Sequence, residues 1–225
     1  PSQVVKYPYM AAMTEQFILD NALRAEAQGY DVFAIGSIQD PALEQARALV
    51  DIPVVGYGES AMHLACCLSS KFVVIAFEKG FDQMIDLRIK RLGLSERGLP
   101  TVIIDADFKQ VSQGFTEDNV LMDLFTQAAH RAIEQGAEAI IPGQLYLSEA
   151  IAHAKITRIE DVPIIDGLSA NLKMAEIMHD LKSLDISTTR RGYVHARPPA
   201  DMIEHARKFQ GREGIDKSTS TKQIT

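Results

Sequence analysis

One strand–helix unit occurs twice in this chain, and the repeat limits the possible folds more than any other feature. The first copy is "GYDVFAIGSIQDPALEQARALVDIPVVGYGESA", from Gly29, and the second is "GAEAIIPGQLYLSEAIAHAKITRIEDVPIIDGLSA", from Gly136. Each copy begins with a glycine that ends a helix, then continues with an apolar strand, a turn, an amphipathic helix and a second short strand opened by proline. Apolar strands that alternate with helices indicate parallel sheets covered by helices on both faces.

The repeat predicts an α/β fold with two pseudo-symmetric, Rossmann-like lobes that face each other across an active-site cleft. We expect residues 1–70 and 168–225 to form lobe 1, because the helix after Asp166 leads the chain back to it. Residues 71–167 form the expected lobe 2. The polar end of the chain, residues 211–225, has little to bury and is predicted to be a flexible tail.

Composition and charge exclude several classes of partner. Hydrophobic residues make up 46% of the 225 residues and tryptophan is absent, which favours an aliphatic α/β core. The net charge is −7 with scattered Lys and Arg, so neither nucleic acid nor an anionic membrane is an expected partner. Apolar runs are too short to cross a bilayer, and no export signal opens the chain. Cys66 and Cys67 are adjacent and form no disulfide framework, so we expect a cytoplasmic protein.

The two strand-to-helix turns of the repeat are the candidate site. Ligands of open parallel sheets bind beyond the carboxyl ends of the strands, which places Ser37 and Gln144 at equivalent positions. Backbone N–H groups at the following helix starts can hold a carboxylate or a developing oxyanion. The residues expected to bind a small-molecule substrate are Gly36, Ile38, Gly58, Ser60, Gly143, Gln144 and Leu145.

Three further stretches identify a related family. "SIQDPALEQAR", "IPVVGYGESAMHLA" and "VPIIDGLSANLKMAEIM…LDISTTRRGY" resemble the aspartate/glutamate/hydantoin racemase superfamily, and within it the hydantoin and allantoin racemase branch. The resemblance runs from Tyr30 to Tyr193 and implies two α/β lobes, a site between them and a homo-oligomer. The family's opening strand and its Asn-containing loop are not matched, since Pro1 enters the pattern late.

The resemblance also implies a cysteine at the end of each repeated strand, one removing the α-proton and the other returning one. Ser37 and Gln144 stand in those two places. A thiol, with a pKa near 8.5, is readily tuned into a base. A serine hydroxyl needs another group to take its proton, and a glutamine amide only forms hydrogen bonds. A two-base racemisation is therefore not available at these positions.

Ser37 with Glu59 and His63 is the predicted catalytic set, because Glu59 and His63 are four residues apart and share a helix face. Each has a simpler interpretation. Ser37 can be a turn residue, Glu59 a first-turn acid favoured by the helix dipole, and His63 a structural histidine. No cofactor is expected, with a divalent metal ion shared by Glu59 and His63 as the alternative. Asp40-Pro41 is interpreted as a helix start, with the acid as N-cap.

We expect an enzyme that acts without two thiols on a small hydantoin-like cyclic ureide or related carboxylate, by hydrolysis, elimination or isomerisation. A first alternative is a non-catalytic protein that binds a small molecule and has a binding or regulatory role. A second is a hydantoin-type racemase whose base has moved to Cys66 or Cys67. Asp105 and Asp107 close another strand and can reach the cleft.

Overall fold

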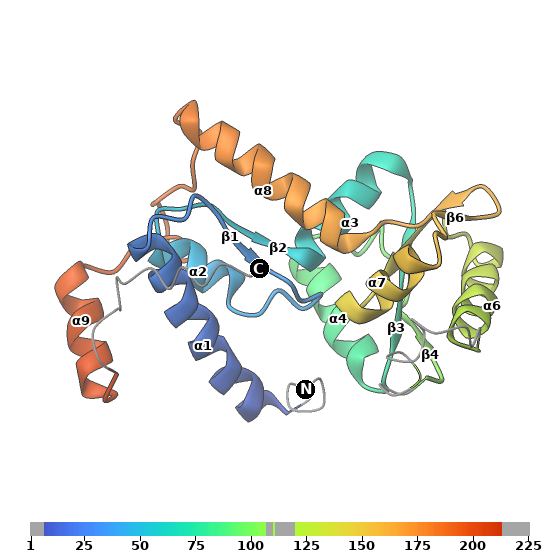
Figure 1. The fold of residues 1–225 in the computed structure, drawn as a ribbon, viewed down its shortest axis with the longest axis horizontal. Helices are drawn as coiled ribbons and strands as arrows, with labels where there is room; N and C mark the ends of the chain where they lie inside the picture. The colour runs from blue at the N-terminus through green and yellow to red at the C-terminus, as the bar shows by residue number, and fades with distance from the viewer. Residues whose placement is uncertain (1–6, 107–109, 111–119, 213–225) are drawn as a thin grey trace, which may run out of the picture. The chain divides into compact units, whose positions relative to one another are not determined.

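A computed structural model of the chain describes residues 7–106, 110 and 120–212 (Figure 1). Asp107 and residues 213–225 of the predicted tail lie outside the described residues. Helices alternate with strands, as expected for the α/β class. The chain divides into two compact units: unit 1 is Pro1–Ile35, Pro41–Val55 and Ala175–Thr225, and unit 2 is Gly36–Asp40 and Gly56–Met174.

These units and the predicted lobes place several segments differently. Residues 36–40, 56–70 and 168–174 belong to unit 2, whereas the repeat placed them in lobe 1. Residues 56–70 group this way because helix α3 (Tyr57–Leu68) packs on the strands of unit 2. The division into two lobes with a cleft between them stays a prediction.

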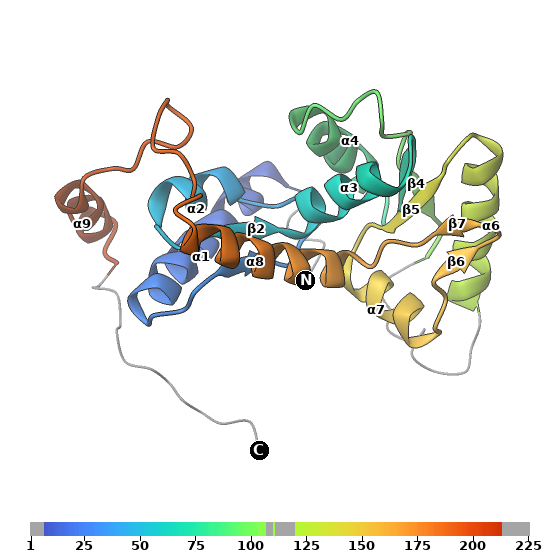
Figure 2. The same cartoon turned by 90° about the horizontal axis from the view of Figure 1, so that it is seen from above.

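The sheet of unit 2 is parallel and has the order β4-β3-β5. Its central strand β3 (Phe72–Phe77) is buried along its whole length, because helices cover both of its faces. Helices α4 and α6 lie on opposite sides of it (Figure 2). The remaining elements that form this unit's layers are β4 (Val102–Ile104), β5 (Ala139–Pro142), α4 (Phe81–Arg91), α6 (Val120–Glu134) and α7 (Leu145–His153).

The side chains of β3 alternate between two layers, as the strand period requires. Val73, Ile75 and Phe77 lie in a core shared with α6 and α7. Phe72 faces the other way, where a Cβ placed on Gly98 would meet both Phe72 and Ile89 of α4. The apolar run seen in the sequence is therefore a strand covered on both sides.

The second short strand of the second copy is smaller than predicted. Val162–Pro163 forms β7, which pairs antiparallel with β6 (Arg158–Ile159). Ile164 makes only an isolated parallel bridge to Ile140, and the N–H of Ile165 donates to the Ile140 carbonyl at 2.8 Å. Two residues of the predicted strand thus turn into a hairpin instead of extending the sheet.

Unit 1 is built around a two-stranded pairing of β1 (Phe33–Ile35) with β2 (Val54–Gly56). Helices α1 (Pro8–Ala27), α2 (Leu43–Leu49) and α9 (Ala200–Phe209) accompany it, and α8 (Gly167–Ser183) enters it from unit 2. Its buried apolar residues are Ala22, Leu23, Ile35, Leu43, Ala46, Val50, Ile52 and Val54. No helix among the residues that the structure describes is long and apolar enough to cross a membrane.

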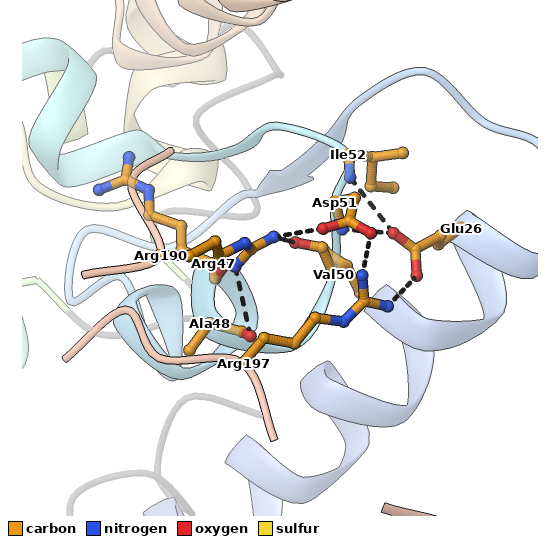
Figure 3. Close-up of polar contacts among 8 residues, drawn as sticks. All are labelled: Glu26, Arg47, Ala48, Val50, Asp51, Ile52, Arg190 and Arg197. Carbon is orange, nitrogen blue, oxygen red and sulfur yellow. Dashed lines mark hydrogen bonds and ion pairs between the residues drawn. The ribbon is translucent and has the colours of Figure 1, made fainter. Parts of the chain in front are cut away.

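Within unit 1, arginines that follow α8 bond residues of α1 and of the end of α2 (Figure 3). Arg190 donates to the carbonyl oxygens of Arg47 at 2.7 Å and Val50 at 2.6 Å, at the end of α2, and pairs with Asp51 at 2.7 Å. Arg197 pairs with Asp51 and, at 3.3 Å, with Glu26. Since α9 has no buried residue, polar contacts carry much of this attachment.

Candidate functional site

Asp40 joins the turn at residues 36–40 to the start of α3. Its carboxylate accepts the backbone N–H of Gly58 at 2.8 Å and of Glu59 at 2.7 Å. The helix that follows Asp40 in sequence starts later, at Leu43, with Ala42 as its N-cap residue. The predicted N-cap role of Asp40-Pro41 is therefore wrong, because the carboxylate satisfies the exposed donors of a different helix.

Arg88 of α4 completes this contact, donating from Nε to Asp40 at 3.1 Å. The Asp40 side chain is fully buried and the Arg88 side chain is 5% exposed. Burial raises the pKa of Asp40 to about 6, against the lowering effect of Arg88 and of the two N–H groups. Loss of water around the carboxylate outweighs its partners, so the ionised form is held at a cost.

A close backbone approach accompanies this contact. A Cβ built on Gly58 would lie 2.1 Å from the carbonyl oxygen of Ile38, so only glycine fits there. Ile38 itself is buried. The N–H groups of Gly58 and Glu59 are already bonded to Asp40, so these two donors are not available to a ligand at the start of α3.

Ser37 lies half-buried in the same turn. Its hydroxyl donates to Oε1 of Gln39 at 2.5 Å, and its carbonyl oxygen accepts the N–H of Asp40 at 3.0 Å. The Nε2 atom of Gln39 is buried without a protein partner among the described residues. Ser37 is thus held by its neighbours, and its hydroxyl oxygen keeps lone pairs for a further donor.

Glu59 and His63 follow on α3. Glu59 is half-buried and His63 is exposed. The ring atom Nδ1 of His63 lies 2.8 Å from the carbonyl oxygen of Glu59. A carbonyl can only accept, so a neutral ring carries its proton on Nδ1 and leaves the Nε2 lone pair available. His63 therefore folds back over the helix turn that Asp40 binds and presents a potential base.

Gln144 uses its amide within the fold. Oε1 accepts the N–H of Phe77 at 3.2 Å, and Nε2 donates to the Phe77 carbonyl at 2.7 Å. Gln144 is buried and is the N-cap residue of α7, without a side-chain cap bond to that helix. The amide thus ties the end of β5 to the end of β3. Only the second N–H and the second oxygen lone pair of this amide remain for the predicted contact with a substrate.

The residues around Gln144 are packed tightly. A Cβ on Gly143 would lie 2.8 Å from Cβ of Ala76. The buried hydroxyl of Tyr57 donates to the Pro142 carbonyl at 2.9 Å, and burial raises the pKa of this phenol. The first residue of α3 therefore anchors the last residue of β5.

Another contact brings the two predicted turns together. A Cβ built on Gly36 would lie 4.0 Å from Cδ2 of Leu145, the first residue of α7. The turn at residues 36–40 therefore bonds the start of α3 through Asp40, and its Gly36 lies near the first residue of α7. All ten residues predicted from the sequence belong to unit 2. Ser60 differs in role, since its buried hydroxyl donates to Asn171 at 3.4 Å inside the unit.

The alternative reactive groups are less well placed. Cys66 and Cys67 are free thiols on the last turns of α3. Burial raises the pKa of Cys66 despite the nearby Arg97, which opposes thiolate formation. Within residues 7–106, 110 and 120–212, no three His, Cys, Asp or Glu side chains form a metal-binding group.

A cavity of about 470 Å³ lies beyond the carboxyl ends of β3 and β4. The sequence singled out Asp105 there but missed the polar residues after β3, although the strand-end rule applies equally to both strands. Phe77, which binds Gln144, ends β3 two residues before the cavity wall begins. The lining residues are Lys79, Gly80, Asp82, Gln83, Ile103, Ile104 and Asp105.

Comparison with known proteins identifies the family. A family model described as Asp/Glu/Hydantoin racemase matches residues 3–175. The chain belongs to the Asp/Glu/hydantoin racemase family. It is 29% identical over 185 residues to the hydantoin racemase of Pseudomonas sp. (strain NS671), covering 80% of this chain and 71% of that protein. The hydantoin racemase of Rhizobium meliloti is 28% identical over 174 residues, with 74% and 68% covered.

A solved structure of the same racemase family supports the fold. The allantoin racemase from Klebsiella pneumoniae matches with a TM-score of 0.73 at 26% identity, covering 85% of this chain and 75% of that one. The expected α/β fold with parallel strands is thereby confirmed, as is the expected relationship to hydantoin and allantoin racemases.

Proposed function

We propose that this protein is an isomerase that exchanges the acidic ring hydrogen of a small hydantoin-like cyclic ureide without using two thiols. The ring lies where the turn at residues 36–40 meets the first turns of α3 and α7. Ser37, Glu59 and His63 are the reacting side chains. The observation that carries the proposal is that this turn bonds the start of α3 through Asp40 and lies near the start of α7 at Gly36.

The relatives support isomerisation over hydrolysis or elimination, because those named above are hydantoin and allantoin racemases. Such rings carry a hydrogen on the carbon beside a carbonyl, and its removal gives an enolate. A mechanism for this family member needs a base and a donor set for the enolate oxygen. Ser37 and Gln144 cannot provide a thiolate, so the base lies elsewhere.

His63 supplies the base in this scheme. Its Nε2 lone pair takes the ring hydrogen as a proton, and the C–H electrons move to the carbonyl oxygen. The Ser37 hydroxyl turns its single proton from Gln39 Oε1 to that oxygen, and the first turn of α7, whose N-cap residue gives it no side-chain bond, also donates to it. A proton returned by the imidazolium restores the starting configuration. A proton delivered by water to the opposite face inverts it, and the hydroxide left behind takes the proton of the imidazolium. Glu59 stabilises the imidazolium.

Hydrogen exchange in deuterated water tests this scheme. Single enantiomers of 5-substituted hydantoins and of allantoin are incubated with the protein, and the ring hydrogen is followed by NMR while optical activity is recorded. We expect loss of the hydrogen signal together with loss of optical activity, and no ring opening. His63→Gln should slow exchange by about 100-fold or more, and Ser37→Ala by about 10-fold, as expected for a lost oxyanion donor shared with backbone N–H groups.

Cys66→Ala and Cys67→Ala are the matched controls and should retain the parent rate. Parent rates in both His63→Gln and Ser37→Ala would defeat the assignment. Exchange that disappears in Cys66→Ala would move the base to the thiol. Ring-opened product would replace isomerisation by hydrolysis, and thermal stabilisation by a ureide with no exchange would indicate a binding protein.

A further inference from the structure

We propose that Asp40, supported by Arg88, is the positioning residue of this site, holding Ser37 and Glu59 in register without touching the ligand. The proposal rests on the proposed function for its catalytic readout. It concerns a residue to which the sequence assigned only a helix cap. Its basis is a set of buried contacts that join three segments far apart in the chain.

The contacts act on the backbone of both reacting residues. The carboxylate accepts the N–H of Glu59 at 2.7 Å and of Gly58 at 2.8 Å. The Asp40 N–H donates to the Ser37 carbonyl at 3.0 Å. Asp40 therefore bonds Ser37 on one side and Glu59 on the other, and a shift of its side chain moves one relative to the other.

The geometry around Asp40 leaves no space for adjustment. Asp40 has a positive φ of 47°, a backbone conformation that is uncommon for a non-glycine residue. The Gly58 Cα is pressed against the Ile38 carbonyl, where a Cβ would lie 2.1 Å away. The side chain is fully buried, so no ligand reaches it. Its effect on a reaction is transmitted through the turn.

Arg88 sets the charge of this contact. The charged groups that face Asp40 are Arg88 from α4 and Glu59 from α3. Arg88 favours the carboxylate form, which accepts both N–H groups, and Glu59 disfavours it. A protonated Asp40 would have a hydroxyl in place of one acceptor and would release one N–H.

Asp40→Asn tests the role, since it keeps the shape and removes the charge. We expect the turnover number for ring-hydrogen exchange to fall by about 100-fold, the size associated with small misplacements of reacting groups. The KM should change by less than about threefold, because Asp40 does not contact the ligand. Unfolding by urea and circular dichroism establish that the variant is folded.

A double variant separates positioning from stability. Asp40→Asn leaves the buried Arg88 without the Asp40 carboxylate, and Asp40→Asn/Arg88→Met removes that buried charge as well. We expect the double variant to recover stability but not turnover. Turnover that recovers together with stability would overturn the proposal, as would a parent turnover number in Asp40→Asn.

Arg88→Met provides a second readout. Without the guanidinium the carboxylate form of Asp40 is less favoured, so the acid limb of the exchange rate should move to higher pH. If the acid limb of the exchange rate stayed at the same pH in Arg88→Met, positioning by the carboxylate form of Asp40 would be contradicted.

Amide hydrogen exchange of Gly58 and Glu59 is the readout that needs no turnover. We expect both amides to exchange faster in Asp40→Asn than in the parent, relative to the amides of β3. If no ureide is turned over by the parent, the proposed function fails while this measurement still decides whether Asp40 holds the turn. Unchanged protection of both amides would refute the positioning role by itself.

Discussion

The side-chain amide of Gln144 pairs with both backbone groups of Phe77, accepting its N–H at 3.2 Å and donating to its carbonyl at 2.7 Å. The backbone pairing of β3 with β5 ends at Ile75 and Pro142. The amide copies the donor and acceptor of a peptide group and so continues the pairing past the last backbone partner. A glutamine at this strand end thus has a structural reason.

Gln144→Glu should destabilise the protein by about 2–3 kcal/mol, because a carboxylate cannot donate to the Phe77 carbonyl and leaves it unsatisfied in a buried position. Urea unfolding monitored by circular dichroism measures the change. Gln83→Glu is the matched control, since Gln83 is exposed on α4, and it should stay within about 0.5 kcal/mol of the parent. Equal stability of the two variants would show that the paired amide contributes little.

Stability should fall as the pH rises from about 4 to 6, to the extent that Asp40 controls it. The pKa of Asp40 is raised from 3.8 to about 6 in the folded protein. The folded state therefore binds the Asp40 proton more tightly than the unfolded state does. The resulting contribution of Asp40 to the free energy of unfolding is complete below pH 3.8 and is lost above pH 6. Two pKa units correspond to about 3 kcal/mol. The urea midpoint should fall between about pH 4 and 6 in the parent, and this fall should be absent in Asp40→Asn. Parallel curves of midpoint against pH for the two proteins would refute the prediction.

Asp166 should act with the opposite sign. Burial alone would raise its pKa, but hydrogen bonds from Ser169, Ser148 and the N–H of Leu168 lower it below 3.8. Its contribution is present above pH 3.8 and is lost as the pH falls through the lowered value. Asp166→Asn should therefore flatten the acid-side loss of stability that the parent shows. Urea unfolding of both proteins below pH 4 measures this change. If the stability of Asp166→Asn fell as steeply with falling pH as that of the parent, the prediction would be wrong.

Gly58→Ala should unfold or strongly destabilise the protein, by at least about 3 kcal/mol, because its Cβ would lie 2.1 Å from the Ile38 carbonyl and the backbone must move. Gly36→Ala is the control in the same region, since its nearest contact is Leu145 at 4.0 Å. It should change stability by less than about 1 kcal/mol. Thermal unfolding distinguishes them, and a well-folded Gly58→Ala variant would show that this approach is looser than described.

Arg190 and Arg197 should differ in their response to salt. Arg190→Ala removes donors from the carbonyl oxygens that end α2 and should cost about 1–3 kcal/mol at any ionic strength. Arg197 bonds only carboxylates, so Arg197→Ala should cost less than about 1 kcal/mol and have no effect in 1 M salt. Urea unfolding at low and high sodium chloride checks both. A large, salt-independent effect of Arg197→Ala would contradict the comparison (Figure 3).

Local sequence patterns were sufficient for the class of fold and the family. The apolar run Phe72–Phe77 predicted a strand covered on both faces, and β3 is such a strand. The turn at Gly143-Gln144 predicted a helix directly after it, and α7 begins at Leu145. These features depend on side-chain period and backbone preference over a few residues, and both can be read along the chain.

The partners of the polar side chains were decided only by the tertiary structure. Asp40 was expected to cap the helix that follows it, yet it binds the N-terminus of α3 and Arg88, 48 residues away. Gln144 was expected to meet a ligand, and its amide binds Phe77, 67 residues away. A buried donor or acceptor pairs with whatever group folding brings within about 3 Å. Sequence spacing contains no information on that distance, because it depends on how strands and helices from remote parts of the chain pack together.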